Sequence, residues 1–200
     1  MSFKLLVVDW TSDQSKIMRL LVNSPVSPYN SFLRQVIRGQ NDGISTNDRW
    51  RNIIVELIDN NEETVYTLKV VNIESGDLVG AAIFDIHSSQ TPATTVIERL
   101  FPTMTENSPH VSLLTLNVQT KCDANTIGQI MIEWGIEKAT SLGIDFWATS
   151  DSVGADLYRC NSMEVVKAVA TSPGFWNVRR RVVNNRVSYR SSYLNTEGFW

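Results

Sequence analysis

The chain has 200 residues, of which 42% are hydrophobic, and its formal net charge is −3 at pH 7. This length suits one domain spanning residues 1–200, and the slight acidity argues against general nucleic-acid binding, which needs a surplus of lysine and arginine. Two cysteines occur, no apolar run approaches the roughly 20 residues that span a bilayer, and no signal peptide is evident, so we expect a cytoplasmic protein without membrane partners.

The first part of the chain predicts one strand and two helices. Residues 3–8 form a short apolar run typical of a strand, and Ser12 is placed to cap a helix that ends near Asn23. Residues 45–48 (STND) match a capping box and are followed by apolar residues at helical spacing. Between the two helices, residues 25–43 have an interrupted pattern with prolines and glycines, which indicates a loop.

An antiparallel hairpin is predicted next. Residues 64–72 and 78–86 are rich in β-formers and are separated by a short Glu-Ser-Gly-Asp loop. Gly80, inside the second run, indicates a bulge. Residues 87–110 show no sustained period, and we expect a long loop there that borders a functional site.

Residues 111–148 carry the strongest pattern in the chain. An apolar run at 111–118 is followed by a polar turn, an amphipathic stretch at 125–142 with Gly143 as its C-cap, and a second apolar run at 144–148. We expect one face of this helix to be buried, with Ile127, Ile130, Met131, Trp134 and Leu142 on it. A right-handed crossover makes the two strands parallel and leaves the helix N-terminus, which attracts anions, beside the carboxyl end of the first strand.

The C-terminal part predicts a short helix and two more strands. Asp151 can cap a helix that runs through Tyr158, and residues 163–170 and 187–194 have strand patterns. Arg179–Arg181 form a basic run, which usually marks solvated surface. The predicted order is β-α-α-β-β-β-α-β-α-β-β, an α/β fold whose mixed sheet has antiparallel N-terminal strands and a central parallel β-α-β crossover.

This order and the residues of the central unit resemble the GNAT superfamily of acyl-CoA-dependent acetyltransferases, especially its small fungal-type members, over nearly the whole chain. The segment LLTLNV resembles the family's fourth strand, NTIGQIMIEWGIEKATSLGI the helix after its pyrophosphate loop, and DFWATS its fifth strand. The segment LYRCNSMEVV resembles the family's ending, in which a tyrosine opens a short segment that leads into the sixth strand. The resemblance implies a GNAT-like fold that uses acetyl-CoA.

The resemblance also implies where acetyl-CoA binds. The thioester would lie along the fourth strand at Leu116 and Val118. The diphosphate would lie on Ala124, Asn125, Thr126, Ile127, Gly128 and Gln129. The family's loop usually reads Q/R-x-x-G-x-G/A because small residues let main-chain N–H groups approach the pyrophosphate. Here only the last glycine remains, and Asp123, where glutamine or a basic residue is usual, repels a diphosphate unless its carboxylate points into water.

For catalysis, Tyr158 matches the tyrosine that returns a proton to the departing thiolate in many members of the family. The fourth strand has no glutamate to act as a base. Asp85 or His87, at the end of the hairpin's second strand, is therefore the candidate base, directly or through a water. Each of these residues also has an ordinary structural interpretation. The two histidines, His87 and His110, are not clustered in the sequence.

Three functions remain open at this stage. The first is transfer of an acetyl or other acyl group from acyl-CoA to a small-molecule amine. The second is a GNAT-like fold that has lost CoA dependence and catalyses a cyclisation, dehydration or isomerisation, which the altered loop favours. The third is a non-catalytic binding module. We expect a small-molecule substrate and a monomer or homodimer.

Overall fold

The computed structural model describes residues 2–23, 43–60, 63–87, 108–119, 122–151, 155–169 and 175–180. The elements in chain order are β1 (Phe3–Val7), α1 (Trp10–Asn23), α3 (Thr46–Asn60), β2 (Val65–Asn72), β3 (Leu78–His87), β4 (His110–Val118), α5 (Ala124–Leu142), β5 (Asp145–Asp151), α6 (Ala155–Cys160), β6 (Glu164–Val169) and β7 (Phe175–Arg180).

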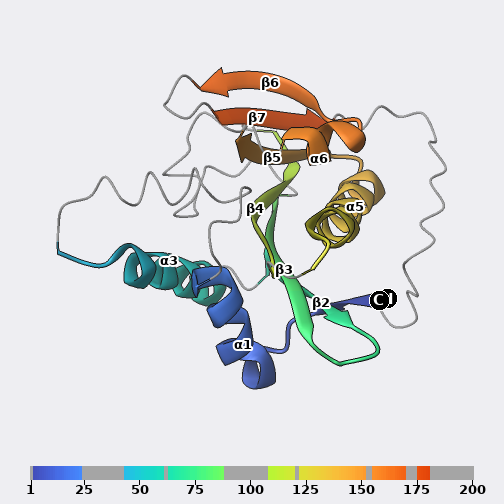
Figure 1. Cartoon of the computed structure of the whole chain (residues 1–200). Helices are drawn as coiled ribbons and strands as arrows, with labels where there is room; N and C mark the ends of the chain where they lie inside the picture. The colour runs from blue at the N-terminus through green and yellow to red at the C-terminus, as the bar shows by residue number, and fades with distance from the viewer. Residues whose placement is uncertain are drawn as a thin grey trace.

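The described strands form one seven-stranded mixed sheet in the order β1-β2-β3-β4-β5-β7-β6. Strands β4 and β5 are parallel, and every other neighbouring pair is antiparallel. Helix α5 lies on one face of the sheet, and α1 and α3 lie on the other (Figure 1). The predicted α/β fold with antiparallel N-terminal strands and a central parallel crossover is confirmed.

Helix α5 has a cap at each end, and its C-cap is the glycine that the sequence predicts. Asp123 is the N-cap, and Gly143, with φ 69°, is the left-handed C-cap whose N–H donates to carbonyls of the last turn. The prediction for Leu142 was wrong, because this residue is 44% exposed at the end of the helix. Ile132 and Ile136 are buried in addition to the expected face. A second strip of the helix surface is therefore buried as well.

Glycines let α5 lie close to the sheet. A Cβ atom on Gly135 would lie 2.6 Å from a ring carbon of Phe146 and 2.7 Å from one of Phe84. A Cβ atom on Gly80 would lie 2.5 Å from Cγ2 of Ile127. The expected bulge is also present beside Gly80, because the pairing of β2 with β3 shifts there and leaves Val79 as the extra residue.

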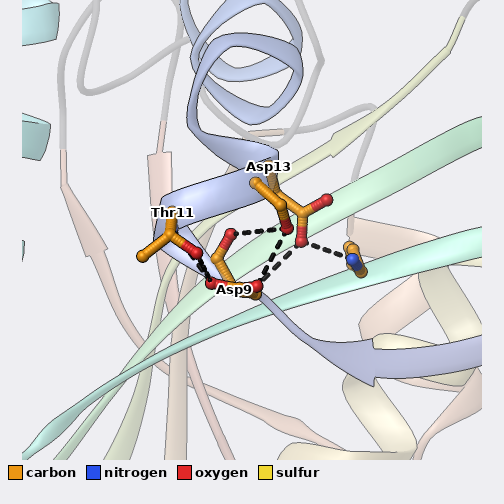
Figure 2. A network of polar contacts seen from close by, with 5 residues as sticks. Asp9, Thr11 and Asp13 are labelled. Atoms are coloured by element: carbon orange, nitrogen blue, oxygen red, sulfur yellow. Dashed lines mark hydrogen bonds and ion pairs between the residues drawn. The ribbon is translucent and has the colours of Figure 1, made fainter.

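Helix α1 begins at Trp10, two residues before the cap that the sequence predicts. The carboxylate of Asp9 accepts hydrogen bonds from the Thr11 amide at 3.0 Å and the Thr11 hydroxyl at 2.6 Å, so it caps the helix in place of Ser12. The Asp13 carboxylate accepts a hydrogen bond from the Asp9 amide at 3.0 Å and also forms an ion pair with Lys69 of β2. Figure 2 shows Asp9, Thr11 and Asp13 grouped at the start of the helix. The Asp13–Lys69 pair therefore ties the first turn of α1 to the sheet.

Strand β7 was not predicted. Arg179 and Arg180 were interpreted as part of a basic surface run, but residues 175–180 pair with β5 on one side and β6 on the other. Long-range pairing of this kind overrides a local pattern with charged residues. The strand predicted at residues 187–194 lies outside the described residues. So do residues 25–42 of the loop predicted at 25–43 and residues 88–107 of the long loop. Among the helices that are described, none has the length and apolar character needed to cross a membrane.

Candidate functional site

The sheet splits between its two parallel strands. Strands β4 and β5 pair from His110–Leu113 with Asp145–Ala148. Beyond that point β4 continues beside β3 to Val118, and β5 continues beside β7 to Asp151. Because the described β4–β5 pairing stops halfway while each strand keeps its other neighbour, the two strands diverge toward their carboxyl ends. This end of parallel strands is where α/β folds commonly bind ligands.

A bulge lies at the point where the strands diverge. Ile83 pairs with Thr115 and Phe84 pairs with Leu113, which leaves Leu114 as the extra residue of β4. Bulges interrupt a ladder locally and occur often beside active sites. The bulge therefore lies at the apex of the split, and it changes the direction of the β4 main-chain groups there.

Leu116 and Val118, the residues predicted to hold the thioester, are buried in the core beneath α5. Their main-chain N–H and C=O groups point in a different direction from their side chains. The N–H of Gln119 donates to the carbonyl of Val79 at 2.9 Å, and main-chain groups alternate along a strand, so those of Leu116 and Val118 face away from β3 toward the split.

At the start of α5, the Asp123 carboxylate lies over the first amides of the helix. It accepts from the amide of Asn125 at 3.1 Å, the amide of Thr126 at 3.3 Å and the hydroxyl of Thr126 at 2.5 Å. The Thr126 hydroxyl, followed by its amide, holds the pKa of Asp123 below its ordinary value. The carboxylate is exposed but turned back onto these amides, so it competes with a diphosphate for two of the predicted contacts.

The other residues predicted at the diphosphate, apart from Ala124, have structural contacts. Ile127 is fully buried, and its amide donates to the Asp123 carbonyl at 3.1 Å. Gly128 lets α6 approach, because a Cβ atom there would lie 2.9 Å from a methyl group of Leu157. The amide side chains of Gln129 and Asn161 exchange two hydrogen bonds of 2.8 Å each. These contacts join the first turns of α5 to α6.

A row of buried polar side chains runs across β2, β3 and β4 on the face that α1 and α3 cover. Its members are each at most 8% exposed, and they are Thr67, Asp85, His87, His110, Thr115 and Asn117. Side chains alternate along a strand, so the apolar neighbours Phe84 and Leu113 turn to the α5 face. Polar side chains are rarely buried together without a specific role.

Asp85 and His87 form a buried pair, with His87 Nε2 at 2.8 Å from Asp85 Oδ2. The His87 and His110 rings lie with centroids 4.8 Å apart, because His87 pairs with His110 across β3 and β4. The histidines are therefore clustered in space although they are separate in sequence. A histidine at the end of one strand and another at the start of its antiparallel neighbour was the signal that could have revealed this.

Tyr158 lies on the opposite side of the sheet. It is 1% exposed and belongs to the core on the α5 face, whereas Asp85 and His87 lie on the α1 and α3 face. The two predicted catalytic groups can therefore meet a common substrate only through the split between β4 and β5. Among the described side chains, no three of His, Cys, Asp or Glu are arranged to hold a metal ion.

No protein-family model matches the sequence, and no curated protein matches it significantly. Solved structures do match. A Corynebacterium glutamicum protein described as a histone acetyltransferase and related acetyltransferase is 18% identical, with a TM-score of 0.65 over 94% of this chain and 100% of its own. A putative acetyltransferase of Salmonella typhimurium, solved with its cofactor acetyl-CoA, is 11% identical, with a TM-score of 0.54 over 92% of this chain and 96% of its own.

The C-terminal condensation domain of Ebony, solved in complex with beta-alanyl-dopamine, is 10% identical, with a TM-score of 0.64 over 90% of this chain and 99% of its own. These similarities do not support the narrower expectation of a fungal-type member. At these low sequence identities, the similarities establish the fold alone. The chain has the GNAT acetyltransferase fold.

Proposed function

We propose that this protein transfers an acyl group from acyl-CoA, represented by acetyl-CoA, to a small-molecule amine. The observation that carries the proposal is the split between β4 and β5, which has a bulge at its apex. The Asp85–His87 pair lies on β3 beside Ser112 and His110, in the half of β4 that is paired with β5. Similar structures named as acetyltransferases, one of them solved with acetyl-CoA, support the choice of donor. A small-molecule substrate and a monomeric or homodimeric protein remain predictions.

In the proposed reaction the amine nitrogen attacks the thioester carbonyl, a C–N bond forms and the C–S bond breaks. In the tautomer that has its hydrogen on Nε2, His87 donates to Asp85 and would take the amine proton on Nδ1. Asp85 then stabilises the imidazolium that forms. The departing thiolate takes a proton from Tyr158, which reaches it from the opposite face of the sheet.

The donor would bind along the main chain of Leu116 and Val118, which faces the split. Its diphosphate would bind the first amides of α5 after the Asp123 carboxylate turns away into water. Asp123 is exposed, so this movement disturbs no buried contact. A neutral N-cap should therefore favour the donor, and Asp123→Ser keeps a capping oxygen while it removes the charge.

Two measurements test the proposal on the full chain. We expect millimolar acetyl-CoA to raise the melting temperature, because a ligand that binds the folded state stabilises it, and Asp123→Ser to bind acetyl-CoA more tightly. We also expect a panel of small amines to stimulate thiol release from acetyl-CoA. A melting temperature unmoved in both proteins, with no amine-dependent thiol release, would reject the proposed transferase.

One observation favours a second candidate, a reaction that does not use CoA. The helix amides that would hold the diphosphate are already bonded to Asp123. The fold also occurs in a condensation domain solved with beta-alanyl-dopamine. If acetyl-CoA binds neither the natural protein nor Asp123→Ser, this candidate replaces the first. The non-catalytic module becomes the better hypothesis if no panel molecule is turned over.

A further inference from the structure

Two amide side chains join helix α5 to helix α6. They belong to Gln129, in the second turn of α5, and to Asn161, the residue that follows α6. Gln129 Nε2 donates to Asn161 Oδ1 at 2.8 Å, and Asn161 Nδ2 donates to Gln129 Oε1 at 2.8 Å. Because each hydrogen bond prefers a nearly linear geometry, two reciprocal bonds fix both the separation and the orientation of the groups. We call these two side chains the amide pair.

The amide pair is held by further hydrogen bonds on each side. Asn161 Nδ2 also donates to the Leu157 carbonyl at 2.8 Å, and Gln129 Nε2 also donates to Glu133 at 2.9 Å. A side-chain amide has two N–H groups, so both amides use all their donors. Asn161 is 6% exposed, and a buried amide that lost its partner would cost free energy. The amide pair therefore has one strongly preferred arrangement.

Helix α6 needs support of this kind. It has six residues, and a helix this short is not stable by itself. The chain leaves it through Ser162, whose φ of 57° lies in the left-handed region that favours glycine. The amides of Asn161 and Met163 donate to the Tyr158 carbonyl at 3.0 and 3.2 Å, so the end of the helix turns around Tyr158. The amide pair then ties this end of α6 to α5.

Tyr158 lies between two points that α5 fixes. One residue before it, Leu157 packs so closely on Gly128 that a Cβ atom there would lie 2.9 Å from a Leu157 methyl group. Three residues after it, Asn161 bonds to Gln129. Tyr158 itself is 1% exposed, so its ring is enclosed by neighbouring side chains. The start of α5 therefore sets where the Tyr158 ring stands.

We propose that Gln129 and Asn161 are positioning residues, whose amide pair holds Tyr158 where it can protonate the departing thiolate. This inference rests on the proposed transferase function and adds two residues to it. In that step the thiolate takes the Tyr158 proton and becomes a thiol, and the phenolate regains a proton from water. Neither amide touches a reacting atom. Their effect is on distance, and a misplacement of about 1 Å can lower a rate by about 100-fold.

The first test follows the Tyr158 ring in the full chain without any ligand. In NMR spectra of protein with carbon-13 in its tyrosine rings, Tyr158→Phe identifies the Tyr158 signal by its loss. We expect Gln129→Ala and Asn161→Ala to shift this signal, and the double variant to shift it about as far as either one, because the pair acts as a unit. Thr140→Val is the control, since it removes a 2.7 Å bond to the Ile136 carbonyl at the other end of α5 and should leave the signal in place.

The second test measures amine-dependent thiol release from acetyl-CoA. Asn161→Ala should lower kcat by about 10- to 100-fold and change the KM for acetyl-CoA by less than about twofold. In a Tyr158→Phe protein the same substitution should lower kcat by less than about twofold further, because the acid that it positions is gone. If Asn161→Ala folds poorly, Ser162→Gly is added to both proteins, since glycine favours the left-handed conformation found there.

An unmoved Tyr158 signal in both single variants would overturn the inference. An equal fold loss of kcat with and without the Tyr158 hydroxyl would also overturn it, as would a Tyr158→Phe protein with the natural kcat. Failure of the transferase proposal is a different result, because the natural protein would then release no thiol. In that case a shifted Tyr158 signal would keep the amide pair as the anchor of Tyr158, and an unmoved signal would reject both proposals.

Discussion

The two faces of the same sheet differ in chemistry, and β3 shows the difference within two residues. Phe84 points to the α5 face and is buried among apolar side chains, while Asp85 points to the α1 and α3 face and is buried beside His87. Both side chains are 0% exposed, so burial alone does not separate them. Both faces have an apolar core, but the α1 and α3 face also holds a row of buried polar side chains. Substitutions on the two faces should therefore have different consequences.

The largest effect on stability should come from the apolar face. Phe84→Ala removes a fully buried ring that lies 4.8 Å from the Trp134 ring, and we expect the free energy of unfolding to fall by about 3–5 kcal/mol. Equilibrium unfolding in urea measures this. Asp85→Asn, at the next position, should change stability far less. A Phe84→Ala loss below about 1 kcal/mol would mean that the α5 face is not the principal core.

The next effect concerns the fit of α5 on the sheet. Gly135→Ala places a methyl group against two aromatic rings, and we expect a loss of about 1–3 kcal/mol despite the higher helix propensity of alanine. Gly128→Ala is the matched variant in the same helix. It meets the end of the Leu157 side chain, which can move, so its loss should be smaller. Equal stability of the two variants in urea would contradict the close packing at Gly135.

A smaller effect depends on pH and lies at the start of α1. Lys69 lowers the pKa of Asp13, so the native state favours the ionised carboxylate. This stability is present above the unfolded pKa of about 3.9 and is lost as pH falls through the lower native pKa. Asp13→Asn should cost up to about 1 kcal/mol at pH 7 and progressively less toward pH 3. An Asp13→Asn deficit that persists unchanged at pH 3 would show that the carboxylate charge is not its cause.

The smallest effect is expected on α5. Burial, with a further contribution from Glu133, raises the pKa of Glu137 above its ordinary value of 4.5. The native state therefore disfavours the ionised form, and Glu137→Gln should stabilise the protein at pH 7 by a few tenths of a kcal/mol. The gain should disappear as pH falls below about 4.5, where the folded and unfolded chains are both protonated. Melting curves at pH 7 and pH 4 compare the two proteins.

The sequence predicted the elements whose patterns are local. The crossover unit was confirmed within a few residues at each boundary, because the apolar runs, the helical period and Gly143 all act over short distances. The prediction that Leu142 is buried was wrong, because its position at the end of the helix, and not the helical period, sets its exposure. Strand β7 was missed because its two neighbours, and not its own composition, make it a strand.

The candidate site was less predictable because it depends on register. Asp85 and His87 were named from their place at a strand end, but the position of His110 beside them follows from which residue of β4 faces His87. Thr67 was not named at all, since a threonine in a strand has no local sign of an unsatisfied hydroxyl. The repulsion of an anion by Asp123 was expected from its charge, and its capping of the first amides of α5 was the part that the structure added.

The difference between the two faces is tested most directly by the free energy of unfolding of Thr67→Val without any ligand. The substitution replaces a buried hydroxyl that has no described partner with a methyl group of similar size. We predict a gain of about 1 kcal/mol in stability, because the substitution removes the cost of a buried hydroxyl that has no described partner. A loss of stability of that size would contradict the account that the buried polar row on this face is held at a cost to the fold.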